Sequence, residues 1–103
     1  MATAENRAPN AAPSIVRIWT SKSVVSGGDV VLCHVLTTTN VASVEIRVAN
    51  NGFTMPREAI GSFRVAYTVP RLPWFYHGKH DVQFIARNAR GDATSMWRSF
   101  VLE

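Results

Sequence analysis

The sequence contains a single cysteine, Cys33, among its 103 residues. An intrachain disulfide is therefore excluded. A single cysteine is compatible with both an oxidising and a reducing compartment. No run approaches the roughly 20 apolar residues of a membrane-spanning helix, so we expect no membrane insertion. Residues 1–13 are rich in Ala, Asn and Pro and lack the apolar stretch of a signal peptide. We therefore expect either an intracellular protein or a module of a longer exported chain.

Charged residues are also scarce, at 17% of the chain against the roughly 25% that is usual for globular domains. Nine of the eleven basic residues are arginine, and the net charge is +4. This balance would suit an anionic partner, such as nucleic acid, an anionic glycan or an anionic membrane surface. The arginines are scattered rather than clustered, which favours a plain solubilising role and predicts no specific nucleic-acid binding.

Catalytic and metal-binding arrangements are missing as well. Ser, His and Asp all occur, but no nucleophile elbow orders them. Gly27-Gly28 precedes a predicted strand and not a helix, so it is no phosphate loop. His77 and His80 are three residues apart, yet zinc needs three or four ligands and no second cysteine is present. We predict no enzymatic activity, no metal site and no cofactor, and we interpret Cys33 as a buried, slowly reacting core residue.

What the sequence has in abundance is alternation of apolar and polar residues. Val82, Phe84 and Ala86 recur with period two, the spacing of one face of a β-strand. A turn over residues 88–91 follows, and a second alternating run then extends over residues 94–102. Further strands are predicted over residues 15–19, 30–37, 44–48 and 63–69, with a short edge segment over 53–58 that contains Pro56.

Seven short strands separated by turns predict an all-β fold, a β-sandwich over residues 14–103. Residues 1–13 are expected to form a disordered tail or linker. The register of the strand over residues 30–37 is ambiguous, because both of its faces are apolar. We favour Val31, Cys33 and Val35 as the inward set, since His34 then points outward and Leu32 lies on the outer face. Trp19 and Trp97 lie in strands and are interpreted as packing residues.

The segment from Gly78 to Asp92 resembles the bacterial immunoglobulin-like domains. This segment matches the pattern of their penultimate strand and of the turn after it. The matching residues are its glycine, its alternating apolar residues, its alanine, Asn88, Gly91 and Asp92. His80 stands where the family usually has tyrosine, so the usual hydroxyl contact is lost or is replaced by an imidazole N–H. Ala86 takes the place of a second cysteine. The resemblance therefore implies an immunoglobulin-like sandwich of about seven antiparallel strands without a disulfide, similar also to fibronectin type III domains.

Two groups of side chains are candidates for ligand binding. Trp74, Phe75 and Tyr76 form an aromatic cluster beside two prolines. Exposed aromatics stack on sugars or anchor protein partners, although a cluster between strands is also typical of a cap on the open end of a sandwich. Arg47 and Arg87, with Arg98 as a further candidate, form a stripe that could dock an anionic glycan or acidic protein. The alternative is an ordinary solvated face with partners such as Glu45.

The tripeptide Arg90-Gly91-Asp92 is a third candidate, because it is the integrin-recognition sequence and lies in a predicted hairpin. A guanidinium and a carboxylate held apart by a glycine turn can bridge an acidic pocket and a metal ion. The alternative is that the tripeptide only forms the turn, because the family pattern that this segment resembles already includes Gly91 and Asp92 at these positions.

These observations predict a non-catalytic structural or interaction module of a bacterial surface, secreted or phage-associated protein. The alternative is a carbohydrate-binding module or an accessory domain of a larger enzyme. The expected partner is a protein or glycan, or the neighbouring domains of a longer chain, and the expected location is outside the cytoplasm.

Overall fold

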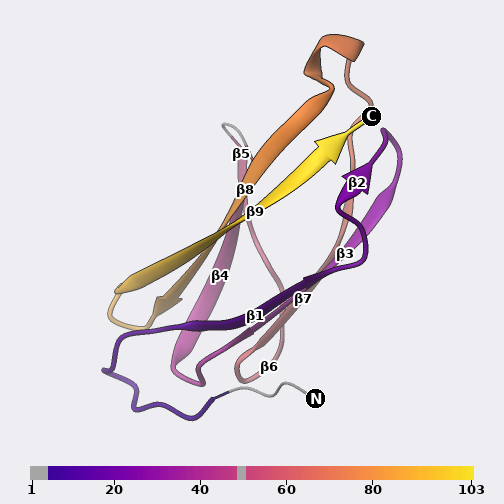
Figure 1. Cartoon of the computed structure of the whole chain (residues 1–103). Coiled ribbons are helices and arrows are strands. Elements are labelled where there is room, and N and C mark those ends of the chain that lie inside the picture. The colour runs from indigo at the N-terminus through magenta and orange to yellow at the C-terminus, as the bar shows by residue number, and fades with distance from the viewer. Residues whose placement is uncertain (1–4, 49–50) are drawn as a thin grey trace.

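The computed structural model describes residues 5–48 and 51–103, which form two stacked β-sheets (Figure 1). In these ranges the chain forms nine strands and one 3-10 turn, η1. The elements are β1 (Ile15–Thr20), β2 (Val24–Val25), β3 (Val30–Thr37), β4 (Val41–Val48), β5 (Asn51–Thr54), β6 (Arg57–Ala59), β7 (Ser62–Thr68), η1 (Trp74–Tyr76), β8 (Gly78–Asn88) and β9 (Ala93–Leu102). No helix in the described ranges is long and apolar enough to cross a membrane.

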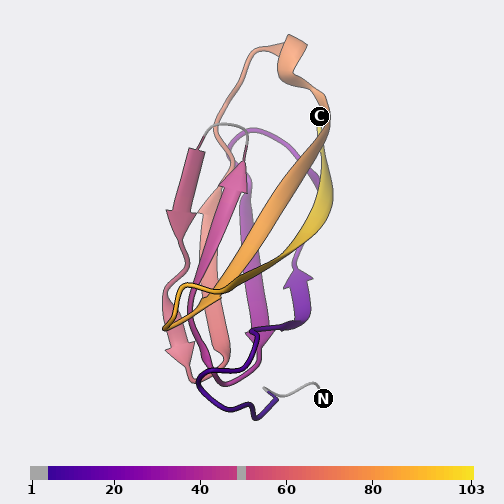
Figure 2. The same cartoon turned by 90° about the vertical axis from the view of Figure 1, so that its left-hand side faces the viewer.

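One sheet has four strands in the order β1-β3-β7-β6, and the other has five in the order β2-β9-β8-β4-β5. Neighbouring strands are antiparallel except β2 and β9, which are parallel. Figure 2 shows the sheets facing each other as two layers. The predicted all-β, immunoglobulin-like sandwich without a disulfide is confirmed.

The predicted single edge segment over residues 53–58 is in fact two strands in different sheets. Met55 is buried and its N–H donates to the Val44 carbonyl of the five-stranded sheet, 2.8 Å away. The next carbonyl, that of Pro56, accepts from Arg64 of the four-stranded sheet at 3.1 Å. Pro56 has no N–H to donate, so it suits the point where the chain leaves one ladder for the other.

The core lies between the sheets, where the predicted alternations meet. Val82, Phe84 and Ala86 of β8 are all buried, and Phe84 has no exposed surface. Val31, Cys33 and Val35 of β3 are buried opposite them, which confirms the favoured register. Leu32 lies half exposed on the outer face, as this register requires.

Trp19 and Trp97 are not packing residues, and that interpretation is wrong. Trp19 is 44% exposed and Trp97 is 58% exposed. Trp19 pairs with His34 and Trp97 with Gln83, so each indole lies on the outer face of its sheet. Aromatic residues favour strands through the fit of the ring on the pleated surface, and this preference holds on either face.

Residues 5–13 form hydrogen bonds to the base of the sandwich. Glu5 forms a parallel bridge with Thr38, and the Arg7 N–H donates to Thr39 Oγ1 at 2.9 Å. The Ala11 carbonyl accepts from Asn40 Nδ2 at 2.6 Å and from Asn88 Nδ2 at 3.1 Å. Residues 1–4 lie outside the described residues.

Phe84→Ala is expected to lower the free energy of unfolding by about 3–5 kcal/mol, because it removes a fully buried ring from the centre of the core. Gln83→Ala, on the outer face of the same strand, is the control and should change it by less than about 0.5 kcal/mol. Urea denaturation of the two variants measures both values. Equal stability of Phe84→Ala and the parent would contradict the described packing.

Candidate binding cavity and aromatic turn

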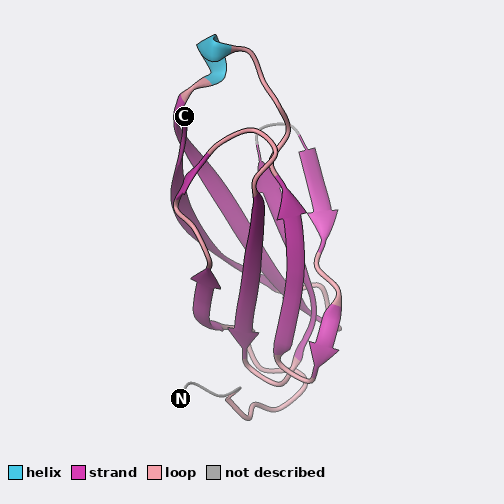
Figure 3. Cartoon of the chain, turned by 90° about the vertical axis from the view of Figure 1, so that its right-hand side faces the viewer, coloured by secondary structure: helices cyan, strands magenta, loops and turns pink. Residues whose placement is uncertain are grey.

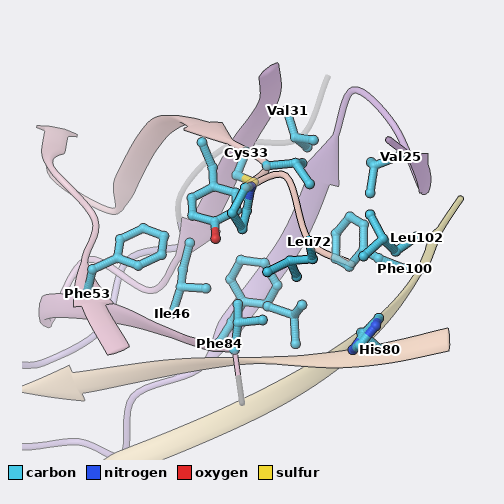
Figure 4. A pocket seen from close by; sticks show the side chains of 15 residues that line it. Val25, Val31, Cys33, Ile46, Phe53, Leu72, His80, Phe84, Phe100 and Leu102 are labelled. Atoms are coloured by element: carbon cyan, nitrogen blue, oxygen red, sulfur yellow. The ribbon is translucent and has the colours of Figure 1, made fainter. Parts of the chain in front are cut away.

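A cavity of about 130 Å³ lies between the two sheets, in the half of the sandwich that carries η1 (Figure 4). It is partly open to solvent. Side chains of both sheets converge on it, and most of them are apolar. The four-stranded sheet contributes Val31, Cys33 and Tyr67, and the five-stranded sheet contributes Ile46, Val48, Phe53, His80, Val82, Phe84, Phe100 and Leu102, with Val25 from β2.

The roof of the cavity is the chain segment between β7 and η1. Val69, Pro70 and Leu72 line the cavity from this segment. The turn before β3 holds it in place, since the Gly28 N–H donates to the Val69 carbonyl and the Val69 N–H to the Asp29 carbonyl, both at 2.8 Å. Gly27 permits this close approach, because a Cβ there would lie 3.0 Å from the Cα of Arg71. The glycine pair therefore positions the roof of the cavity.

Three lining side chains have polar atoms. The ring of Tyr67 stacks on Phe53 with centroids 5.4 Å apart and planes within 5°. Burial raises the pKa of the Cys33 thiol above its usual value, so the thiol stays protonated at neutral pH. His80 lies at the mouth, where its Nε2 is 2.6 Å from the Tyr76 carbonyl oxygen. The imidazole of His80 therefore contacts the backbone four residues upstream. This is the alternative in which an imidazole replaces the usual tyrosine hydroxyl.

The aromatic turn, defined as Trp74, Phe75 and Tyr76 in η1, lies at one end of the molecule beyond the sheets (Figure 3). The three side chains are 79%, 64% and 47% exposed, respectively, and none lines the cavity. The interpretation of this cluster as a cap on the sandwich is therefore wrong, because residues 69–72 take that place. The rings contact one another: Trp74 meets Phe75 edge-on at 82°, and Phe75 meets Tyr76 at 36°.

Arg47 and Arg87 lie on the outer face of the five-stranded sheet and share one carboxylate. Arg47 Nε is 2.8 Å from Glu45 Oε2, and Arg87 Nη1 is 2.8 Å from Glu45 Oε1. The bond from Arg47 first, and that from Arg87 second, hold the pKa of Glu45 below its usual range. Arg98 does not bond to this carboxylate, and its Nη1 donates to the Trp97 carbonyl at 3.0 Å. This geometry is that of a solvated face with cross-strand partners, the plainer of the two alternatives.

Arg90, Gly91 and Asp92 form the turn between β8 and β9, and Asn88 organises it. The Asn88 side-chain oxygen accepts from the N–H groups of Arg90 and Asp92, each at 3.0 Å. Arg90 Nε lies 3.8 Å from Asp92 Oδ2, so the two charges face each other and are not held apart. Gly91 has φ +88°, a conformation that favours glycine. These contacts favour the turn interpretation.

A hydrogen-bonded group on the outer face of the four-stranded sheet was not expected from the sequence. Nε2 of His34 is 2.8 Å from Ser62 Oγ, which is 2.9 Å from Glu58 Oε2. Glu58 approaches the same Nε2, at 3.7 Å, so it does not orient the imidazole through Nδ1 as a catalytic triad requires. Among the described residues, no group of three His, Cys, Asp or Glu side chains could hold a metal ion.

No protein-family model matches this sequence, and no curated protein matches it. Solved structures share its architecture, and the following are two of them. A Niemann-Pick type C2 protein from the Japanese carpenter ant aligns with a TM-score of 0.57 at 9% identity, covering 90% of this chain and 94% of its own. CopC from Methylosinus trichosporium OB3b aligns with a TM-score of 0.51 at 15% identity, covering 88% and 93%. Both likenesses show the fold, a small β-sandwich, and not specifically the bacterial immunoglobulin-like or fibronectin type III branch.

Gly91→Ala is expected to lower the free energy of unfolding by about 1 kcal/mol, because alanine is strained at this positive φ. Nothing lies within 4 Å of the added Cβ, so the cost comes from the backbone alone. Gly91→Asn is the control and should cost less, since asparagine tolerates this conformation. Arg90→Ala should be nearly silent in the same melting experiments. A silent Gly91→Ala would contradict the described turn.

Proposed function

We propose that this domain is a non-catalytic binding module that takes up a small apolar group between its two sheets. The observation that carries the proposal is the cavity, which is lined mainly by aliphatic and aromatic side chains and is partly open to solvent. Small-molecule sites in proteins are typically apolar concavities with a few polar groups that orient the ligand. Here the polar groups are Cys33, Tyr67 and His80.

The volume of the cavity indicates the size of the ligand. An engineered cavity of about 150 Å³ lined by similar side chains stays free of water and binds benzene. A space of about 130 Å³ therefore suits a single aromatic ring or a short alkyl chain. Because the cavity is partly open to solvent, a larger molecule could place one such group inside and leave its polar end in solvent.

A role on a bacterial surface, in a secreted protein or in a phage-associated assembly remains part of the proposal. A sandwich that holds a small ligand or spaces neighbouring domains suits such a protein, and its single buried thiol needs no oxidising or reducing environment. The proposal retains a protein or glycan as a partner for the outer faces. The aromatic turn does not strengthen the carbohydrate alternative, because its rings are tilted against one another and provide no flat platform for sugars.

The proposal predicts saturable binding of benzene or 1-octanol, followed by calorimetry and by the rise in melting temperature. Val31→Phe should fill the cavity, abolish this binding and change the free energy of unfolding by less than about 1 kcal/mol. Val35→Phe is the matched control, since Val35 faces inward on the same strand but does not line the cavity. It should cost about 1–3 kcal/mol through overpacking.

Absence of saturable binding by either compound would overturn the proposal. So would a Val31→Phe variant that loses as much stability as Val35→Phe, because an overpacked site has no free volume.

Cys33 provides an independent readout of occupancy. Burial and the raised pKa should make its reaction with a polar thiol reagent slow in the native protein and fast in denaturant. Saturating benzene should slow the native reaction further, because the thiol lines the cavity. The rate of reaction at neutral pH, with and without benzene, measures both effects. Fast labelling of the native protein would place the thiol at the surface and contradict the structure.

A further inference from the structure

The aromatic turn presents three consecutive large apolar side chains at one end of the molecule with no cover from the described part of the chain. Soluble proteins seldom expose such side chains together unless they meet a partner. The turn is also held in position: the Tyr76 N–H donates to the Pro73 carbonyl at 3.0 Å, and the Tyr76 carbonyl is bound to His80. It is therefore a fixed projection and not a loose loop.

Two cations flank the aromatic turn. Arg71 precedes it by three residues and Lys79 follows it by three, and both are exposed. Neither forms an ion pair within residues 5–48 and 51–103. Asp81, the next carboxylate along β8, accepts a hydrogen bond from Ser99 at 2.9 Å. The exposed rings are therefore flanked in the sequence by two exposed cations that form no ion pair in the described part of the chain.

The chemistry of this surface favours a lipid interface over a sugar. Residues 69–79 contain no Asp, Glu, Asn or Gln, the side chains that bind sugar hydroxyls as acceptors and donors. The edge-on and tilted rings form a wedge. Tryptophan and tyrosine concentrate at membrane–water interfaces, and basic side chains beside them are attracted to anionic headgroups.

We propose that the aromatic turn docks this domain onto an anionic lipid bilayer by shallow insertion of Trp74, Phe75 and Tyr76, with Arg71 and Lys79 beside the lipid phosphates. This is interfacial docking and needs no membrane-spanning segment. Pro70 and Leu72, which line the cavity, lie in the same connection as the aromatic turn. The docking proposal does not rest on the proposed function.

Sedimentation with phosphatidylcholine vesicles, with and without phosphatidylglycerol, tests the docking. The parent protein should bind the vesicles that contain phosphatidylglycerol. Trp74→Ala should weaken binding about tenfold, because a largely exposed indole no longer leaves water. Trp97→Ala is the matched control, an exposed tryptophan on the outer face of a sheet, and should bind as the parent does.

The charges are tested separately. The double variant Arg71→Gln/Lys79→Gln should weaken binding about 25-fold, since each cation near an anionic surface contributes about fivefold. The control is Arg17→Gln/Arg57→Gln, which removes the same charge from exposed positions on the four-stranded sheet. Both double variants have the same net charge. A difference in their vesicle binding therefore shows that the position of the cations matters, and not the net charge alone.

Fluorescence gives a direct readout of insertion. In a Trp19→Phe/Trp97→Phe variant, Trp74 is the single indole, and its emission should shift to shorter wavelength with anionic vesicles. In a Trp19→Phe/Trp74→Phe variant, the emission of Trp97 should not shift.

Absence of binding to anionic vesicles, or equal losses for Trp74→Ala and Trp97→Ala, would overturn the docking proposal. Saturable binding to a glycan or a protein that is lost with Trp74→Ala, without vesicle binding, would assign the turn to that partner instead. Benzene binding is measured without vesicles, so failure of docking and failure of the cavity proposal are distinguishable.

Discussion

The structure depends on the burial of two alternating strands against each other. β8 presents Val82, Phe84 and Ala86 to the interior, and β3 presents Val31, Cys33 and Val35 from the facing sheet. Removing this apolar surface from water is the main favourable term for a chain that has no disulfide and few charged residues. Because side chains alternate strictly along a strand, the same constraint also sets which residues face solvent. The outward positions of Leu32, Arg47 and Arg87 follow from it.

This constraint explains which features could be predicted from the sequence. The sandwich and the register of β3 were predicted because alternation is a local signal that sequence alone contains. The outward position of Trp19 and Trp97 was missed, because strand preference does not reveal the face on which an aromatic ring lies. The attachment of residues 5–13 was missed as well, since its hydrogen bonds join residues about 30 or more positions apart.

The aromatic turn and the cavity also differ in how far the sequence could predict them. The aromatic turn was recognised from Trp74, Phe75 and Tyr76 as residue types, although its exposure required the structure. The cavity has no local signal at all. It depends on how far apart the sheets lie and on the close approach of the 69–72 segment to Gly27, neither of which a linear pattern contains. Arg47 and Arg87 were placed correctly on one face, but the geometry shows that each bonds to Glu45.

The parallel pairing of β2 with β9 has a mechanical consequence. The described chain starts at the base of the sandwich and ends near the aromatic turn, at the opposite end of the long axis (Figure 1). If this module bears load between its ends, tension acts nearly along the strands. The contacts of Val24 with Val101 and of Val25 with Leu102 would then be loaded in shear, so they must break together rather than one after another.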